Sequence, residues 1–153
     1  MGLKESALAM FLGTALGVFV QSHRLGIITG EAVLMRLLGG IVRIPDLAFI
    51  PFAALPNGRI PDEPIPNVVP HLVVEILSPS NTRREMDRKL QEYFSAGVRL
   101  VWIVEPATRA VAVHTGPTAK RTLTFSDTLD GGEVLPGFSM RLSELFTGVE
   151  PTA

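Results

Sequence analysis

Cysteine is absent from this chain of 153 residues, and charged residues make up only 19% of it. Without cysteine the protein has no disulfide, thiol nucleophile or thiolate metal site, and this composition suits a reducing cytoplasm. The net charge is -1, so the chain as a whole lacks a strongly basic surface, although a local basic patch is still allowed. Apolar residues make up 46% of the chain, which is enough for one domain with a substantial core.

An apolar segment near the amino end, residues 7–20, has the composition of a signal-peptide core, but it is short for a membrane span and no clear cleavage site follows it. Its apolar residues recur at helical spacing, and Gly26 lies just beyond, where a helix would stop. We therefore expect a mostly buried helix that covers a sheet, and no membrane partner.

Strand patterns occupy the middle of the chain. Short apolar runs over residues 26–50 predict strands, with Pro45 interrupting a strand or strand pair at 41–50. The proline-rich residues 51–70 predict a loop. The apolar run that begins at Leu72 predicts a buried strand.

The next segment has the pattern of a helix. Thr82 and Glu85 have capping-box spacing, which predicts a helix that begins near Arg83 and ends at Gly97. Beyond it come another buried strand, a hairpin over residues 109–126, a turn at 130–132 and a short helix near 143–146. This order predicts an α/β fold with a central mixed sheet flanked by helices.

One acidic residue stands in the most apolar of these strands, "LVVEILSPS", residues 72–80. A carboxylate such as Glu75 is costly to bury unless it is paired, hydrogen-bonded or bound to a cation. Asp46, in "RIPDLAF", has a similar setting. If the two strands are neighbours, the two carboxylates can converge on one hard cation such as Mg²⁺ or Mn²⁺, which activates water and stabilises charge at a phosphate.

Three segments together resemble the Uma-two family of the PD-(D/E)XK restriction-endonuclease-like superfamily. They are "RIPDLAFIP", "HLVVEILSPSNTRREMDRKLQEYFSAGVRLVWIVEP" and "LPGFSMRLSELF". The resemblance covers nearly the whole chain and implies a restriction-endonuclease-like core. The family is common in bacteria, in many copies.

The resemblance also implies roles. Asp46 and Glu75 would be the carboxylate ligands of a metal ion, and the backbone carbonyl of Ile76 would complete the protein's share of the coordination shell. In the superfamily a lysine usually lies two residues after the second acid, but here that position is Leu77. The family lacks this lysine too, and the implied replacement is Lys89 on the following helix.

The amino end departs from the family pattern. Family members usually begin with a further helix that carries an acidic residue near the site, so the resemblance predicts one domain over residues 1–153 that lacks the family's first helix. Glu5 and Glu31 are available in the sequence, but no physical reason places either in the site.

Each candidate residue also has an ordinary structural interpretation. Glu75 can form a buried ion pair with Arg43 or Arg99. Asp46 can be a turn residue after a proline, and Lys89 can be a solvated helix lysine.

Other polar residues near the site have structural interpretations as well. Tyr93 is expected in the core with its hydroxyl at a polar partner, and Ser80 is expected to cap the helix. Arg83, Arg84 and Arg88 form a basic cluster that fits a solvated helix face, with contact to phosphates as the alternative.

The sequence thus predicts a Mg²⁺- or Mn²⁺-dependent endonuclease that hydrolyses phosphodiester bonds in nucleic acid, with DNA as the preferred substrate. A homodimer suits cleavage of a duplex. The alternative is a weakened or inactive module on the same fold that binds nucleic acid or protein.

Overall fold

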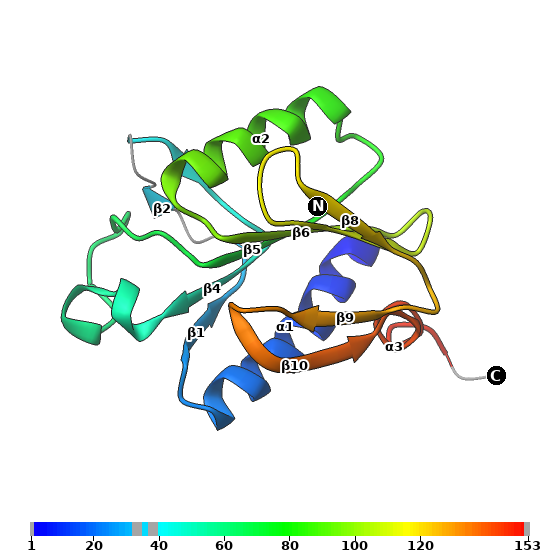
Figure 1. Ribbon diagram of the computed structural model, residues 1–153, viewed down its shortest axis with the longest axis horizontal. Coiled ribbons are helices and arrows are strands. Elements are labelled where there is room, and N and C mark those ends of the chain that lie inside the picture. The colour runs from blue at the N-terminus through cyan, green and yellow to red at the C-terminus, as the bar shows by residue number, and fades with distance from the viewer. Residues whose placement is uncertain (1, 32–34, 37–39, 152–153) are drawn as a thin grey trace.

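The computed structural model describes residues 2–31, 35–36 and 40–151. Its centre is a six-stranded sheet in the order β1-β4-β5-β6-β7-β8 (Figure 1). Only β5 and β6 are parallel, and the other neighbours are antiparallel. The sheet is therefore mixed, as the sequence predicted. Its strands are β1 (Gly26–Thr29), β4 (Leu47–Pro51), β5 (Leu72–Ile76), β6 (Leu100–Glu105), β7 (Ala110–His114) and β8 (Lys120–Leu123).

Helices cover both faces of this sheet (Figure 1). Helix α2 (Arg83–Ala96) lies over one face, and α1 (Leu3–Ser22) over the other. The α1 face is also covered by a two-stranded ribbon, β9 (Thr128–Gly131) with β10 (Leu135–Arg141), and by α3 (Leu142–Thr147). The remaining elements are the strand pair β2 (Met35–Arg36) and β3 (Val42–Arg43) and the short 3-10 helices η1 (Phe52–Ala54) and η2 (Pro56–Gly58).

Helix α1 packs as a core helix. Leu8, Leu12, Leu16 and Val20 recur every four residues, share one face, and are each at most 1% exposed. By length and composition alone α1 is also long and apolar enough to cross a membrane, but this face is packed against the sheet and the ribbon. The expectation that this helix covers the sheet is confirmed. The expectation that it is mostly buried is wrong, because Leu3, Met10 and Val18 on the opposite face are exposed.

Helix α2 forms for the reasons visible in its sequence. The Thr82 side chain accepts a hydrogen bond from the Glu85 backbone N–H at 3.1 Å and caps the first turn. Met86, Leu90 and Tyr93 are buried against the sheet. The predicted helix from near Arg83 to the glycine after Ala96 is confirmed. Because Thr82 supplies the cap, the expectation that Ser80 caps the helix is wrong.

The β9–β10 ribbon and the strands within residues 26–50 differ from the sequence prediction. The β9–β10 ribbon was predicted only as a turn at residues 130–132, because glycine and proline interrupt its alternation and its register shifts between Leu135 and Ser139. Within residues 26–50, β3 pairs with β2 rather than joining the central sheet. The parts of the expected strands at 32–34 and 37–39 lie outside the described residues.

Gly26 does not end helix α1, as its position in the sequence suggested. The helix already ends at Ser22, and Gly26 opens strand β1 opposite Pro51, where a Cβ atom would overlap the backbone carbonyl of Ile50. We expect Gly26→Ala to lower the free energy of unfolding by about 1–3 kcal/mol, the usual cost of overpacking. Gly17→Ala is the control, because a Cβ there meets nothing within 4 Å.

The control substitution in helix α1 should instead raise stability by up to about 1 kcal/mol. Urea unfolding of both variants checks the pair. Equal effects of the two substitutions would contradict the close approach of β1 to β4.

A candidate metal site between strands β4 and β5

Strand register brings the two predicted carboxylates together. Strands β4 and β5 are antiparallel, and Leu47 pairs with Val74. Asp46 and Glu75 are the next residues on each side, so they occupy opposed positions at this end of the strand pair. They share the sheet face of Ala48 and the other residues that pack under α2.

A backbone hydrogen bond fixes Asp46 in place. The N–H of Ile76 donates to Asp46 Oδ2 at 2.7 Å, which ties the carboxylate of one strand to the backbone of the next. Asp46 follows a buried proline, and β4 starts at Leu47. The alternative interpretation of Asp46 as a simple turn residue does not account for this cross-strand bond. The bond occupies Oδ2 and leaves Oδ1 as the oxygen available to a ligand.

Glu75 is buried and is contacted by two side chains of helix α2. It is 5% exposed, and its Oε1 accepts a hydrogen bond from the Tyr93 hydroxyl at 2.6 Å. Lys89 Nζ lies 3.9 Å from Glu75 Oε2 and also 3.9 Å from Glu85 Oε1. The Lys89 side chain is 24% exposed, so its stem lies against the protein while its ammonium reaches the carboxylate. Lys89 is therefore not a fully solvated helix lysine.

The alternative ion pairs for Glu75 do not form. Arg43 instead pairs with Glu92 of helix α2, donating from Nε at 2.6 Å and from a terminal nitrogen as well. Arg99 lies at the amino end of β6, and it lines a different cavity. Neither arginine neutralises Glu75.

Burial keeps both carboxyl groups from ionising easily. Burial raises the pKa of Glu75 to about 7, against the lowering effects of Lys89 and the Tyr93 hydrogen bond, and the nearby Asp46 carboxylate raises it further. The pKa of Asp46 is also raised, chiefly by burial, while the Ile76 hydrogen bond lowers it. A buried acid and a half-buried acid with raised pKa values in one place are typical of a functional site.

These groups open into a small polar cavity of about 180 Å³. Glu31, which no sequence feature placed in the site, lies on its wall, and its charge raises the pKa of Asp46. Within the described ranges, no three His, Cys, Asp or Glu side chains are grouped closely enough to hold a metal ion. The cavity is lined by Glu31, Asp46, Glu75, Ile76, Ser78, Ser80, Asn81, Met86 and Lys89.

The turn after β5 supplies the neutral oxygens of the wall. The Asn81 side-chain oxygen accepts from the backbone N–H of Ser78 at 2.9 Å, and the hydroxyls of Ser78 and Ser80 lie 2.9 Å apart. These bonds hold the turn in shape, and they place polar side chains beside the carboxylates.

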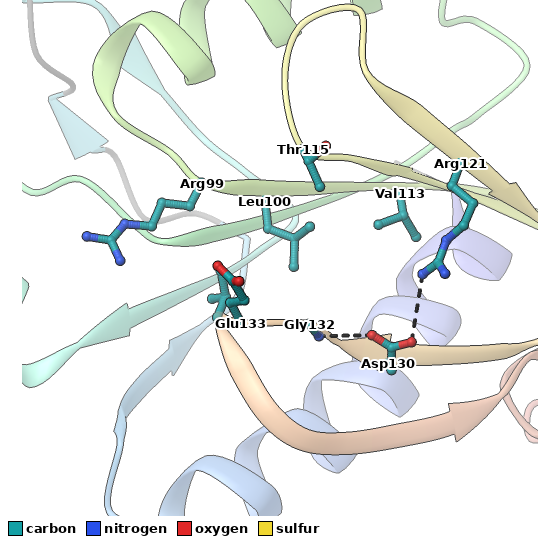
Figure 2. Close-up of a pocket in the computed structure, with 9 residues that line it drawn as sticks. Arg99, Leu100, Val113, Thr115, Arg121, Asp130, Gly132 and Glu133 are labelled. Carbon is teal, nitrogen blue, oxygen red and sulfur yellow. Dashed lines mark hydrogen bonds and ion pairs between the residues drawn. The ribbon is translucent and has the colours of Figure 1, made fainter.

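A second cavity, of about 410 Å³, lies between the sheet and the β9–β10 ribbon (Figure 2). It borders Arg99 and Leu100 at the amino end of β6, whereas the carboxylates lie at the carboxyl end of the parallel neighbour β5. Its Asp130 accepts from the backbone N–H of Gly132 at 3.0 Å and pairs with Arg121 at 3.7 Å (Figure 2). Because its two acids, Asp130 and Glu133, are both exposed, this cavity lacks the buried carboxylate of the first site.

The raised pKa of Glu75 makes the cation-free protein sensitive to pH. An acid whose pKa is higher in the folded than in the unfolded state contributes stability to the fold that is fully present below its unfolded pKa. For Glu75 this contribution is lost as the pH rises through about 7. With EDTA present, we expect Glu75→Gln to be more stable than the wild type at pH 8, by on the order of 1–3 kcal/mol. The difference should shrink at pH 5. Urea unfolding at both pH values checks this, and a wild type that is the more stable form at pH 8 would contradict it.

Comparison with known proteins identifies the family. The model of the Uma2 (Uma-two) family, described as "Putative restriction endonuclease", matches residues 1–143. The chain belongs to the Uma2 family. The segments that carried the resemblance in the sequence are thus those of a true member.

A solved structure shares the fold of this Uma2 chain. It is described as a "putative nuclease belonging to DUF820 from Anabaena variabilis ATCC 29413". The TM-score is 0.84 at 18% sequence identity, and the match covers 96% of this chain and 82% of that one. The restriction-endonuclease-like α/β core predicted from the sequence is confirmed. No curated protein sequence matches the chain.

Proposed function

We propose that this Uma2 chain is a nuclease that depends on Mg²⁺ or Mn²⁺ and hydrolyses phosphodiester bonds in DNA. The observation that carries the proposal is the opposed pair of the half-buried Asp46 and the buried Glu75, at one end of β4 and β5 beside a lysine. The family's description as a restriction endonuclease supports the same reaction class.

The residues present fit a small hard cation. Both acidic ligands offer oxygen, which Mg²⁺ and Mn²⁺ prefer, and a site with few protein ligands suits ions that keep several waters. Burial raises the pKa of both acids, which means that the protein's own groups do not fully stabilise their negative charges. A bound cation would supply that stabilisation. A bound divalent cation lowers the pKa of its water and stabilises charge on a phosphate.

In this proposal the residues of the site have different roles. Asp46 and Glu75 hold the ion, and the backbone carbonyl of Ile76 is the third protein ligand. Lys89 steadies the attacking water or the charge that develops on the phosphate. Its ammonium is 3.9 Å from Glu75 Oε2, beyond hydrogen-bond distance, so it remains available to a substrate oxygen.

A nucleic-acid substrate is supported by the charge on α2. Arg83, Arg84 and Arg88 are exposed on the helix that supplies Lys89 to the cavity. Arg83 pairs with Asp87 at 4.0 Å, and an exposed pair of this kind is weak enough to exchange for a phosphate. Arg88 donates to Glu92 at 3.2 Å, and because Glu92 also binds Arg43, Arg88 shares this acid with a second arginine. A homodimer, in which two such sites meet the two strands of a duplex, and a cytoplasmic location belong to the same proposal.

A second candidate function is a binding module without catalysis. Leu77, at the position where the superfamily carries its strand lysine, packs with the apolar cluster under α2 and supplies no charge. If Lys89 does not replace that lysine, the fold keeps its shape and binds nucleic acid or protein without cutting.

Cleavage assays test the proposal. The wild type is incubated with supercoiled plasmid, single-stranded DNA and RNA oligonucleotides, each with Mg²⁺, with Mn²⁺ and with EDTA. We expect cutting of DNA with either cation and none with EDTA. DNA binding without cutting in every cation would favour the binding module, and cutting of RNA alone would correct the substrate.

A further inference from the structure

The buried hydroxyl of Tyr93 has a more specific arrangement than packing requires. Tyr93 is 1% exposed, is the only tyrosine in the chain, and lies one helical turn after Lys89. Its hydroxyl donates to Glu75 Oε1 at 2.6 Å, a short charge-assisted bond. Burial, and next the Glu75 carboxylate, raise the pKa of this phenol, so the hydroxyl keeps its proton and remains a donor.

The two oxygens of Glu75 are therefore unequal. Oε1 is engaged by Tyr93, whereas Oε2 is the oxygen that lies 3.9 Å from the Lys89 ammonium. Asp46 shows the same division, because its Oδ2 is engaged by the Ile76 N–H. Each carboxylate thus has one oxygen held by a protein donor and one left for a ligand.

We propose that Tyr93 is a positioning residue that restricts Glu75 to ligation through one oxygen, so that the site selects Mg²⁺ or Mn²⁺ against Ca²⁺. The inference rests on the metal site of the proposed function. Mg²⁺ demands octahedral geometry and keeps several waters, so single-oxygen carboxylates satisfy it. Ca²⁺ takes six to eight oxygens and commonly uses carboxylates through both. A carboxylate whose second oxygen is held by a donor serves the smaller ion better.

A Tyr93→Phe variant tests the inference by calorimetric titration with Mn²⁺, Mg²⁺ and Ca²⁺. Phenylalanine keeps the ring in the core and removes only the donor to Glu75. We expect weaker binding of Mn²⁺ and Mg²⁺ together with equal or tighter binding of Ca²⁺. The preference for Mn²⁺ over Ca²⁺ should fall by about tenfold or more, the usual effect of losing a partner that orients a metal ligand.

The control is Trp102→Phe, which also makes a buried side chain smaller. It removes another polar atom from a fully buried aromatic residue, the indole nitrogen, which has no hydrogen-bond partner within the described part of the chain. Trp102 packs in the cluster on the α1 face of the sheet, away from the carboxylates. This variant should leave the preference among cations unchanged. An unchanged preference in Tyr93→Phe as well would overturn the inference.

A second measurement does not depend on the folding of a variant. Because the chain has one tyrosine, growth with 3-fluorotyrosine places a single ¹⁹F label beside the hydroxyl in question. We expect its NMR resonance to move on saturation with Mg²⁺, and to move differently with Ca²⁺. A resonance whose chemical shift does not change when Mg²⁺ binds would overturn the inference. A wild type that binds no cation by calorimetry would overturn the metal site itself, and this inference with it.

Discussion

Cation-dependent cleavage is expected to fall by about 10³-fold or more when Glu75 is replaced by alanine, because a metal ligand supplies several kcal/mol of transition-state stabilisation. Glu75 is one of the two acids that the proposed function assigns to the ion, and the more buried of them. With Asp46 alone, the site has too few fixed oxygens to hold a hydrated cation against water. Cleavage rates at saturating Mg²⁺ and Mn²⁺ measure the effect.

Two further variants separate chemistry from folding. Glu75→Ala leaves the buried Tyr93 hydroxyl without its acceptor, a cost of about 1–3 kcal/mol. Glu75→Gln keeps an acceptor for that hydroxyl and should lose as much activity. Asp130→Asn removes an acid from the second cavity, at the other end of the sheet, and should cut at the wild-type rate. Equal activity of Glu75→Gln and the wild type would remove Glu75 from the mechanism.

Replacing Lys89 with alanine is expected to lower the cleavage rate by about 10²-fold while Mn²⁺ binding stays equal or tightens. The rate falls because a positioned donor near the developing charge is lost. Binding does not fall, because the variant lacks an ammonium that lies 3.9 Å from Glu75 Oε2 and repels an incoming cation. Cleavage assays and calorimetric titration on the same preparation measure the two quantities.

The control for this variant is Lys120→Ala, which removes an exposed lysine from strand β8 at the edge of the sheet. It should change neither quantity. Loss of both cleavage and Mn²⁺ binding in Lys89→Ala would show that Lys89 is a structural residue. Full activity of the variant would show that Lys89 does not replace the superfamily lysine that is absent at Leu77.

Much of the fold was predictable because local signals agree with the tertiary structure. The Thr82 cap, the apolar stripe of α2 and the mainly apolar runs of β5 and β6 each specify an element without help from distant residues. The β9–β10 ribbon has weaker local signals, and its strands exist because they pack on the α1 face.

The site was also predictable in part from local sequence signals. A carboxylate at Glu75 in an apolar strand already demanded a partner, and the family resemblance pointed to Asp46 and Lys89. Their proximity depends on the register of β4 with β5 and on the packing of α2, neither of which the sequence states. Tyr93 was expected in the core with some polar partner, but only the packed helix shows that the partner is Glu75. Glu31 gave no signal in sequence.

In the proposed function, the opposed carboxylates of β4 and β5 form one site for a divalent cation. Calorimetric titration of Mn²⁺ into the wild type and into Glu75→Ala, both metal-free and at pH 8, tests it most directly. We expect one ion per chain in the wild type, a higher melting temperature with Mn²⁺ because the ion binds only the folded state, and loss of both effects in the variant. Equal binding by the two proteins, or no binding by either, would contradict it.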